Sequence, residues 1–151
     1  MRRLVIVVFS VACVAVASAS TALAAEKPAK RPADRVVAMY FHRTQRCPTC
    51  LKMGSYSEEA IGKGLAKQVK QGSVEFHFVD FEDKKNAALA KGYKISGPAL
   101  IVAKVEANKV KEFKDLKDIW TKVQEKPKFL TYVRENVEAY FTKSPAVTDS
   151  P

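Results

Sequence analysis

Apolar residues follow two different periods along this chain, and each period predicts a different kind of element. Apolar residues that are consecutive or alternate predict β-strands at residues 36–41, 74–78, 99–103 and 110–113. Apolar residues spaced three or four positions apart, together with alanine-rich stretches, predict helices that start near residues 47, 85, 116 and 127. The predicted order is β-α-β-α-β-β-α with one extra short helix.

Glycines divide the first predicted helix, which starts at Cys47. Gly54 is expected to interrupt it, and residues 55–58 offer a capping box that would restart it. An apolar stripe then continues to residue 69, and Gly72 ends the helix.

The opening strand–helix–strand segment predicts a parallel pair of strands joined by a right-handed crossover. We therefore expect one α/β domain over residues 36–142, with a small mixed sheet flanked by helices on both faces. Residues 25–35 are charged and contain two prolines, which predicts a flexible linker, and residues 143–151 are expected to be a disordered tail.

The N-terminal segment has the pattern of a secretory signal peptide. Two arginines precede the uncharged apolar run 4–16, and Ala22-Leu23-Ala24 fits the motif that signal peptidase requires. We expect residues 1–24 to be removed, which places the mature protein in the periplasm or outside the cell. An uncleaved leader would instead be a membrane anchor, because its apolar span approaches the about 20 residues that cross a bilayer.

Composition adds information mainly through charge. The 151 residues are 47% hydrophobic and 28% charged, which excludes disordered, collagen-like and coiled-coil chains. A net charge of +10 suggests a polyanionic partner, but loss of the leader's two arginines lowers it to +8. Because the lysines are dispersed among acidic residues, we expect no nucleic-acid binding, and membrane contact only through an uncleaved leader.

The cysteines carry the candidate chemistry. Three cysteines exclude a disulfide-dense scaffold and a four-cysteine zinc site. Cys13 lies in the leader, which leaves Cys47 and Cys50 at the start of a helix that follows a buried strand. A dithiol in this context is typical of redox proteins. The helix N-terminus lowers the pKa of a thiol at its first position, so Cys47 is the predicted nucleophile and Cys50 the resolving thiol.

The neighbours of the pair are expected to tune the thiolate. Arg46 adds positive potential beside Cys47, and Pro48 suits the first helical turn. Thr49 lies between the cysteines, and His42 either tunes the thiolate or is a solvated loop residue.

Two other interpretations of the cysteine pair remain open. It could be an inert structural bridge, although so short a loop stabilises little. It could also be half of a Cu(I) or zinc site with His42 or Met53 as a third ligand.

Residues 36–141 as a whole resemble the thioredoxin superfamily. The shared features are a buried strand, a polar loop, Cys-Pro-Thr-Cys, a helix, a second strand, and Gly97-Pro98 before a third strand. Residues 40–42 and 46–52 most resemble the nitrophenyl compound nitroreductase subunits, which are exported thioredoxin-like proteins found with arsenic-resistance genes.

The resemblance implies roles by position. Cys47 matches the attacking cysteine and Cys50 the resolving one, while Gly97 and Pro98 match the loop that faces the dithiol and accepts the substrate backbone. It also implies a cis peptide bond before Pro98. Thioredoxins differ from this chain in three ways. They have a buried acid in place of Phe41 and a tryptophan in place of Arg46, and their loop before the proline is one residue longer.

We therefore expect an exported, monomeric thiol–disulfide oxidoreductase without a cofactor, which exchanges electrons with partner proteins. The alternative is a metallochaperone or an electron-relay subunit of a reductase system. Two residues outside the motif are expected to have structural roles, His77 within its strand and Trp120 in packing, although an exposed Trp120 could also grip partners.

Overall fold

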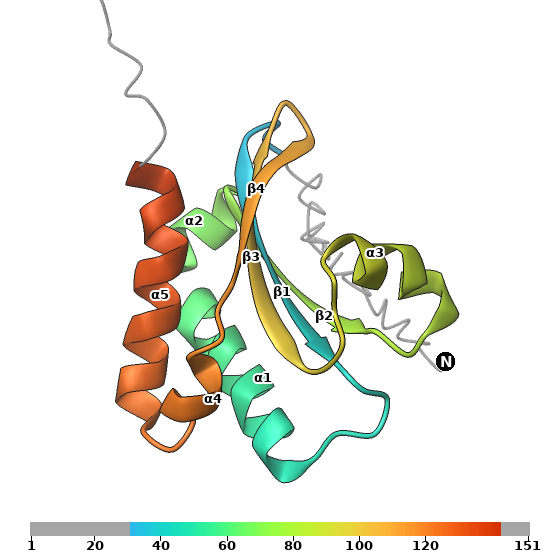
Figure 1. Ribbon diagram of the computed structural model, residues 1–151. Coiled ribbons are helices and arrows are strands. Elements are labelled where there is room, and N and C mark those ends of the chain that lie inside the picture. Colours follow the sequence, from blue (N-terminus) through green and yellow to red (C-terminus); the bar gives the residue numbers. More distant parts are fainter. Residues whose placement is uncertain (1–30, 143–151) are drawn as a thin grey trace, which may run out of the picture.

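The computed structural model describes residues 31–142, and Figure 1 shows how their helices and strands are arranged. The strands are β1 (Arg35–His42), β2 (Val74–Asp80), β3 (Ala99–Glu106) and β4 (Lys109–Asp115). The helices are α1 (Pro48–Gly62), α2 (Ala66–Lys70), the 3-10 turn η1 (Lys84–Asn86), α3 (Ala87–Gly92), α4 (Ile119–Lys122) and α5 (Lys126–Thr142). The predicted signal peptide, most of the predicted linker and the predicted tail lie outside the described residues.

The four strands form one mixed sheet in the order β2-β1-β3-β4. β1 and β2 are parallel, with Val36 opposite Val74, while β1–β3 and β3–β4 are antiparallel. Phe41, near the end of β1, is opposite Ala99, the first residue of β3. The prediction of an α/β domain with a small mixed sheet is therefore confirmed, and the loops after β1 and before β3 lie at the same end of the sheet.

Helices cover the two faces of the sheet unequally. In Figure 1, α1, α2, α4 and α5 lie on one side of the sheet and α3 lies on the other. Tyr40 and Leu100 belong to the larger core cluster, which includes Phe129 of α5, and Phe41 and Ile101 belong to the smaller cluster on the opposite face. Among the described helices, none is long and apolar enough to cross a membrane.

The predicted interruption of the first helix at Gly54 is wrong. α1 continues through this glycine to Gly62, and the break lies at residues 63–65. Gly54 serves a packing need instead, because a Cβ there would lie 2.9 Å from the Phe78 ring and 3.0 Å from the Tyr40 ring. The glycine therefore lets α1 approach the sheet closely, and the helical backbone itself does not require it.

β4 is the most exposed strand of the sheet. It forms one edge, and each of its residues except the last, Asp115, is exposed. Val110 and Phe113 are the large apolar residues on it, and Phe113 contacts the ring of Tyr93 at a centroid distance of 4.9 Å. The helix predicted over residues 116–123 is shorter than expected and is reduced to α4.

Candidate functional site

The two cysteines lie where β1 leads into α1. Cys47 is the N-cap residue of α1, Pro48 follows in the first turn, and Cys50 completes that turn. Proline suits this position because its missing N–H would have no helical partner. The cysteines form a disulfide with a Cα–Cα distance of 5.1 Å, and the Cys50 N–H donates to Cys47 Sγ at 3.2 Å. The predicted pairing of the two sulfurs is thus present.

The two sulfurs differ in their access to solvent. Cys47 and Pro48 are exposed, Thr49 is partly exposed, and Cys50 is only 7% exposed. An incoming thiolate can therefore reach Cys47, while Cys50 is covered by the protein. This asymmetry suits the predicted roles of an attacking and a resolving cysteine.

A buried tyrosine of β1 forms a hydrogen bond with the first turn of α1. The Tyr40 hydroxyl donates to the Cys50 carbonyl at 2.8 Å, and the side chain of Tyr40 is completely buried. Burial raises the pKa of Tyr40 to about 12, and the nearby positive charge of Arg46 opposes this effect. The phenol is therefore neutral at ordinary pH and acts as a fixed hydrogen-bond donor.

Arg46 is held against the sheet by two uncharged groups. Its Nη2 lies 2.6 Å from His42 Nε2, and its guanidinium lies over the Phe78 ring at 5.1 Å from the centroid. His42 Nδ1 lies 2.8 Å from the carbonyl oxygen of Arg43. Because a carbonyl only accepts, we place the proton on Nδ1, which leaves Nε2 as the acceptor for Arg46. His42 is thus a buried, neutral partner of Arg46, and the interpretation of it as a solvated loop residue is wrong.

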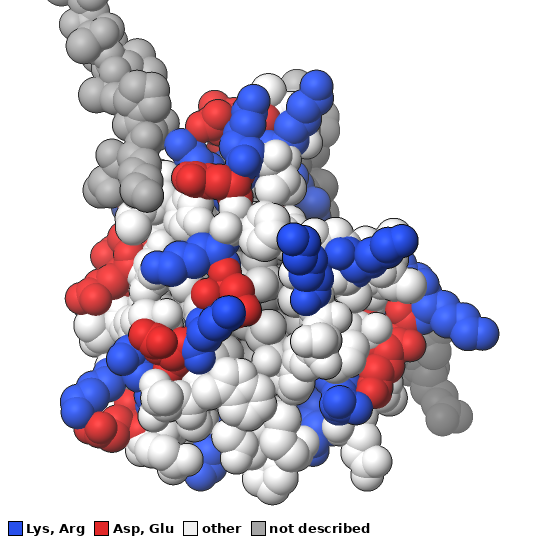
Figure 2. All heavy atoms as spheres, in the orientation of Figure 1, with Lys and Arg blue, Asp and Glu red and all other residues white. Residues whose placement is uncertain are grey.

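A polar hollow of about 480 Å³ opens beside Cys47. Its lining residues are Arg43, Gln45, Arg46, Cys47 and Glu82. Figure 2 shows that Lys and Arg side chains elsewhere on the face in view are interspersed with Asp and Glu. The hollow beside Cys47 combines two arginines with one glutamate and an exposed cysteine.

Gly97 and Pro98 lie at the same end of the sheet as the cysteines, because they immediately precede β3. The expected cis bond is wrong, since the peptide bonds of residues 31–142 include none in the cis form. The trans form is the intrinsically favoured one by about 0.5–1 kcal/mol at an X–Pro bond. Pro98 lines a separate hollow of about 260 Å³ that also contains Trp120.

Trp120 differs from its predicted packing role. Its side chain is 46% exposed, and it faces the hollow beside Gly97 and Pro98. His77 is also exposed, and it forms an ion pair with Glu75 at 3.0 Å when protonated. The exposure of Trp120 is compatible with the alternative role, contact with a partner.

The possible third metal ligands are engaged elsewhere. Both ring nitrogens of His42 have partners in Arg43 and Arg46, and Met53 is completely buried in the core. Within the part of the chain that the structure describes, no group of three or more His, Cys, Asp or Glu residues could hold a metal ion. A metal that took His42 as a ligand at the cysteine pair would therefore displace one of these two contacts.

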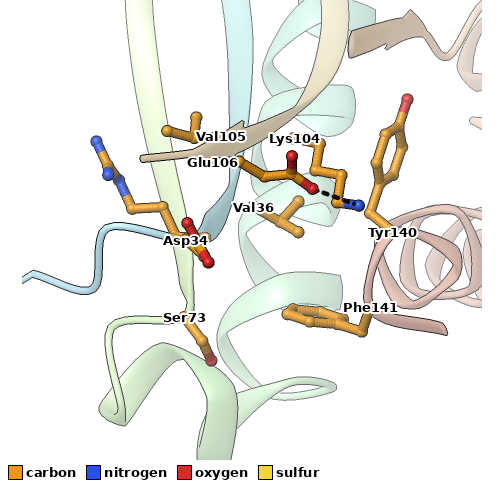
Figure 3. Close-up of a pocket in the computed structure, with 9 residues that line it drawn as sticks. Asp34, Val36, Ser73, Lys104, Val105, Glu106, Tyr140 and Phe141 are labelled. Carbon is orange, nitrogen blue, oxygen red and sulfur yellow. Dashed lines mark ion pairs between the residues drawn. The ribbon is translucent and has the colours of Figure 1, made fainter. Parts of the chain in front are cut away.

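A third hollow lies at the opposite end of the sheet, where β1 begins and β3 ends. It measures about 200 Å³ and has Tyr140 and Phe141 of α5 on one side (Figure 3). Figure 3 shows Lys104 turned toward Glu106, and their ion pair measures 2.8 Å. The charge of Lys104 is thus balanced within this hollow.

The cysteine motif does not show where Tyr40 and Phe78 lie, or which residues hold Arg46. Tyr40 and Phe78 come from strands, and their rings lie against α1 at Gly54, where a larger residue would meet them. A tyrosine within a buried apolar run was the one available signal, since a buried phenol needs a hydrogen-bond partner. The sequence showed that Arg46 is near Cys47, but not that His42 and Phe78 hold it.

No model of a known protein family matches this chain, and no curated protein matches it.

Proposed function

We propose that the protein is an exported thiol–disulfide oxidoreductase of the thioredoxin type. The observation that carries this proposal is the Cys47–Cys50 disulfide at the start of α1, with Cys47 exposed and Cys50 buried. A mixed sheet with helices on both faces supports the thioredoxin-like fold, and the pattern of the first 24 residues supports export.

The proposed reaction is a pair of thiol–disulfide exchanges. A partner thiolate attacks Cys47 Sγ, a mixed disulfide forms, and Cys50 leaves as a thiolate that then takes up a proton. The partner's second thiolate then attacks the sulfur of the partner's first cysteine, which is bonded to Cys47 in the mixed disulfide. This attack closes the partner's disulfide and releases Cys47 as a thiolate. The partner is thereby oxidised to a disulfide, and two electrons enter the protein; the reverse sequence reduces a partner.

The surroundings of Cys47 favour its thiolate form. The N–H of Cys50 already points at Cys47 Sγ, and the N-terminal end of α1 carries a positive partial charge. The guanidinium of Arg46 adds a full positive charge beside it. Groups that stabilise the released thiolate favour the reduced protein, so we expect an oxidising poise.

The test is to trap the mixed disulfide. In Cys50→Ser, reduced Cys47 attacks a peptide disulfide, and the adduct accumulates because no resolving thiol remains. The matched control is Cys47→Ser, which keeps only the buried thiol and should form no adduct. Mass spectrometry before and after reduction measures the adduct. If Cys50→Ser forms none with excess peptide disulfide, the proposal is wrong.

The rival role as a metal-binding protein has a separate readout. Purified protein that contains copper or zinc, with both thiols protected from alkylation, would support the rival. Metal-free protein that oxidises a peptide dithiol supports the oxidoreductase.

A further inference from the structure

The charged residues that line the hollow beside Cys47 are two arginines and one glutamate. Arg43 and Glu82 form an ion pair at 3.2 Å, and the second oxygen of Glu82 accepts the Thr44 N–H at 3.0 Å. Asp80 is occupied in the same loop, because its oxygens accept the Thr44 hydroxyl at 2.7 Å and the Glu82 N–H at 2.9 Å. Glu82 is therefore paired with Arg43, and Asp80, which does not line the hollow, is hydrogen-bonded within its own loop.

Arg46 is the cation left over. Its closest partners are the neutral Nε2 of His42 and the ring of Phe78, and within residues 31–142 no Asp or Glu forms an ion pair with it. These two contacts hold the guanidinium in place without cancelling its charge. It lines the same hollow as the exposed Cys47.

A guanidinium fixed in this way is suited to binding a carboxylate. Its planar set of N–H donors matches the two oxygens of a carboxylate, and the charge assists the hydrogen bonds. A cationic hollow also raises the local concentration of anionic groups and speeds their encounter with the protein. The hollow thus combines a reactive sulfur with a recognition element for negative charge.

We propose that this hollow selects partner proteins in which an acidic side chain lies next to the reacting cysteine. This inference rests on the proposed function, and it names the class of partner that the same site takes. The carboxylate of the partner pairs with Arg46 while the partner thiolate attacks Cys47. The bond changes are those of the exchange above, so the carboxylate positions the partner and is not consumed.

The experiment uses two dithiol peptides that differ only in charge. In one, glutamate residues flank the first cysteine, and in the other lysine residues take their places. The oxidised protein is mixed with each peptide, and the second-order rate constant of exchange is measured from alkylated products. Because the peptides differ in intrinsic thiol reactivity, the quantity compared between proteins is the ratio of the Glu-peptide rate to the Lys-peptide rate.

We expect Arg46→Gln to lower this ratio about tenfold, which corresponds to about 1.4 kcal/mol. Loss of thiolate stabilisation alone would slow both peptides and leave the ratio unchanged. The matched control is Arg134→Gln, which removes an arginine of α5 that lies 3.9 Å from Glu138 and should keep the wild-type ratio. High salt should also lower the wild-type ratio, because it screens charges on a partly open surface.

The outcomes separate the inference from the function on which it rests. A ratio that is the same in wild type and Arg46→Gln overturns the inference and leaves the oxidoreductase standing. Failure of the wild-type protein to react with either peptide overturns both. Glutathione, a small carboxylated thiol, is the third arm: if only its rate depends on Arg46, the anion recognised is a small thiol, and the partner-protein inference is wrong.

Discussion

Gly54→Ala tests how closely α1 must approach the sheet. The added Cβ would lie 2.9 Å from Phe78 Cε1 and 3.0 Å from Tyr40 Cε1, distances that require something to move. Both rings have other contacts, although the Phe78 side chain is 39% exposed and can shift more readily than that of Tyr40. Tyr40 is completely buried and bonded to the carbonyl of Cys50, and Phe78 lies beneath the guanidinium of Arg46.

The expected magnitude follows from two opposing effects. An extra methyl in a packed region costs about 1–3 kcal/mol, while alanine is better than glycine inside a helix by up to about 1 kcal/mol. Gly62→Ala is the matched control, because it changes the same helix at a position where a Cβ meets nothing within 4 Å. We therefore expect Gly54→Ala to be less stable than Gly62→Ala by about 1–3 kcal/mol.

Urea unfolding of the oxidised proteins measures this difference directly. The displaced rings should also disturb the cysteines, so the disulfide of Gly54→Ala should react with a small dithiol at a changed rate, while that of Gly62→Ala should keep the wild-type rate. Equal stability of the two variants, or a more stable Gly54→Ala, would refute the close-approach argument.

Two further substitutions have defined outcomes. Tyr40→Phe removes the donor to the Cys50 carbonyl, which should cost about 1 kcal/mol at neutral pH. Because burial raises the pKa of Tyr40 from 10 to about 12, the phenol ionises more easily in the unfolded chain, which lowers the stability of wild type relative to Tyr40→Phe by up to about 3 kcal/mol as the pH rises from 10 to 12. Urea titrations should therefore show the advantage of wild type over Tyr40→Phe shrinking above pH 10 and then reversing; a constant difference would contradict the burial effect. Gly72→Ala places a side chain at φ +74° and 3.1 Å from Pro32, and it should lower stability by about 1–2 kcal/mol, as measured by urea unfolding. Gly92→Ala, where a Cβ has open space, is its control and should lose nothing.

The sequence was informative where structure depends on neighbours along the chain. The apolar runs located all four strands because a buried strand needs apolar side chains in succession. The cysteine pair was equally readable, since its spacing, its proline and its place before a helix are local features. Gly54 was misread because a glycine that breaks a helix and one that admits a neighbouring ring look the same in sequence.

The contacts that complete the site depend on distant residues. Phe78 is on β2, and it reaches Arg46 only because β2 pairs in parallel with β1. The partner of His42 was equally hidden, since a histidine at the end of a strand is compatible with solvent, a thiolate or an arginine. The bond before Pro98 was misjudged for a different reason, because the expectation came from a resemblance and not from any local feature of this loop.

The exposed edge of the sheet has a consequence for how this protein behaves at high concentration. β4 presents unpaired backbone groups together with Val110 and Phe113, a combination that invites another strand to add to the sheet. Lys109, Lys111 and Lys114 lie on the same strand. Charged side chains, lysines above all, are a common means by which edge strands oppose the addition of another strand, so we expect these lysines to limit growth into extended aggregates.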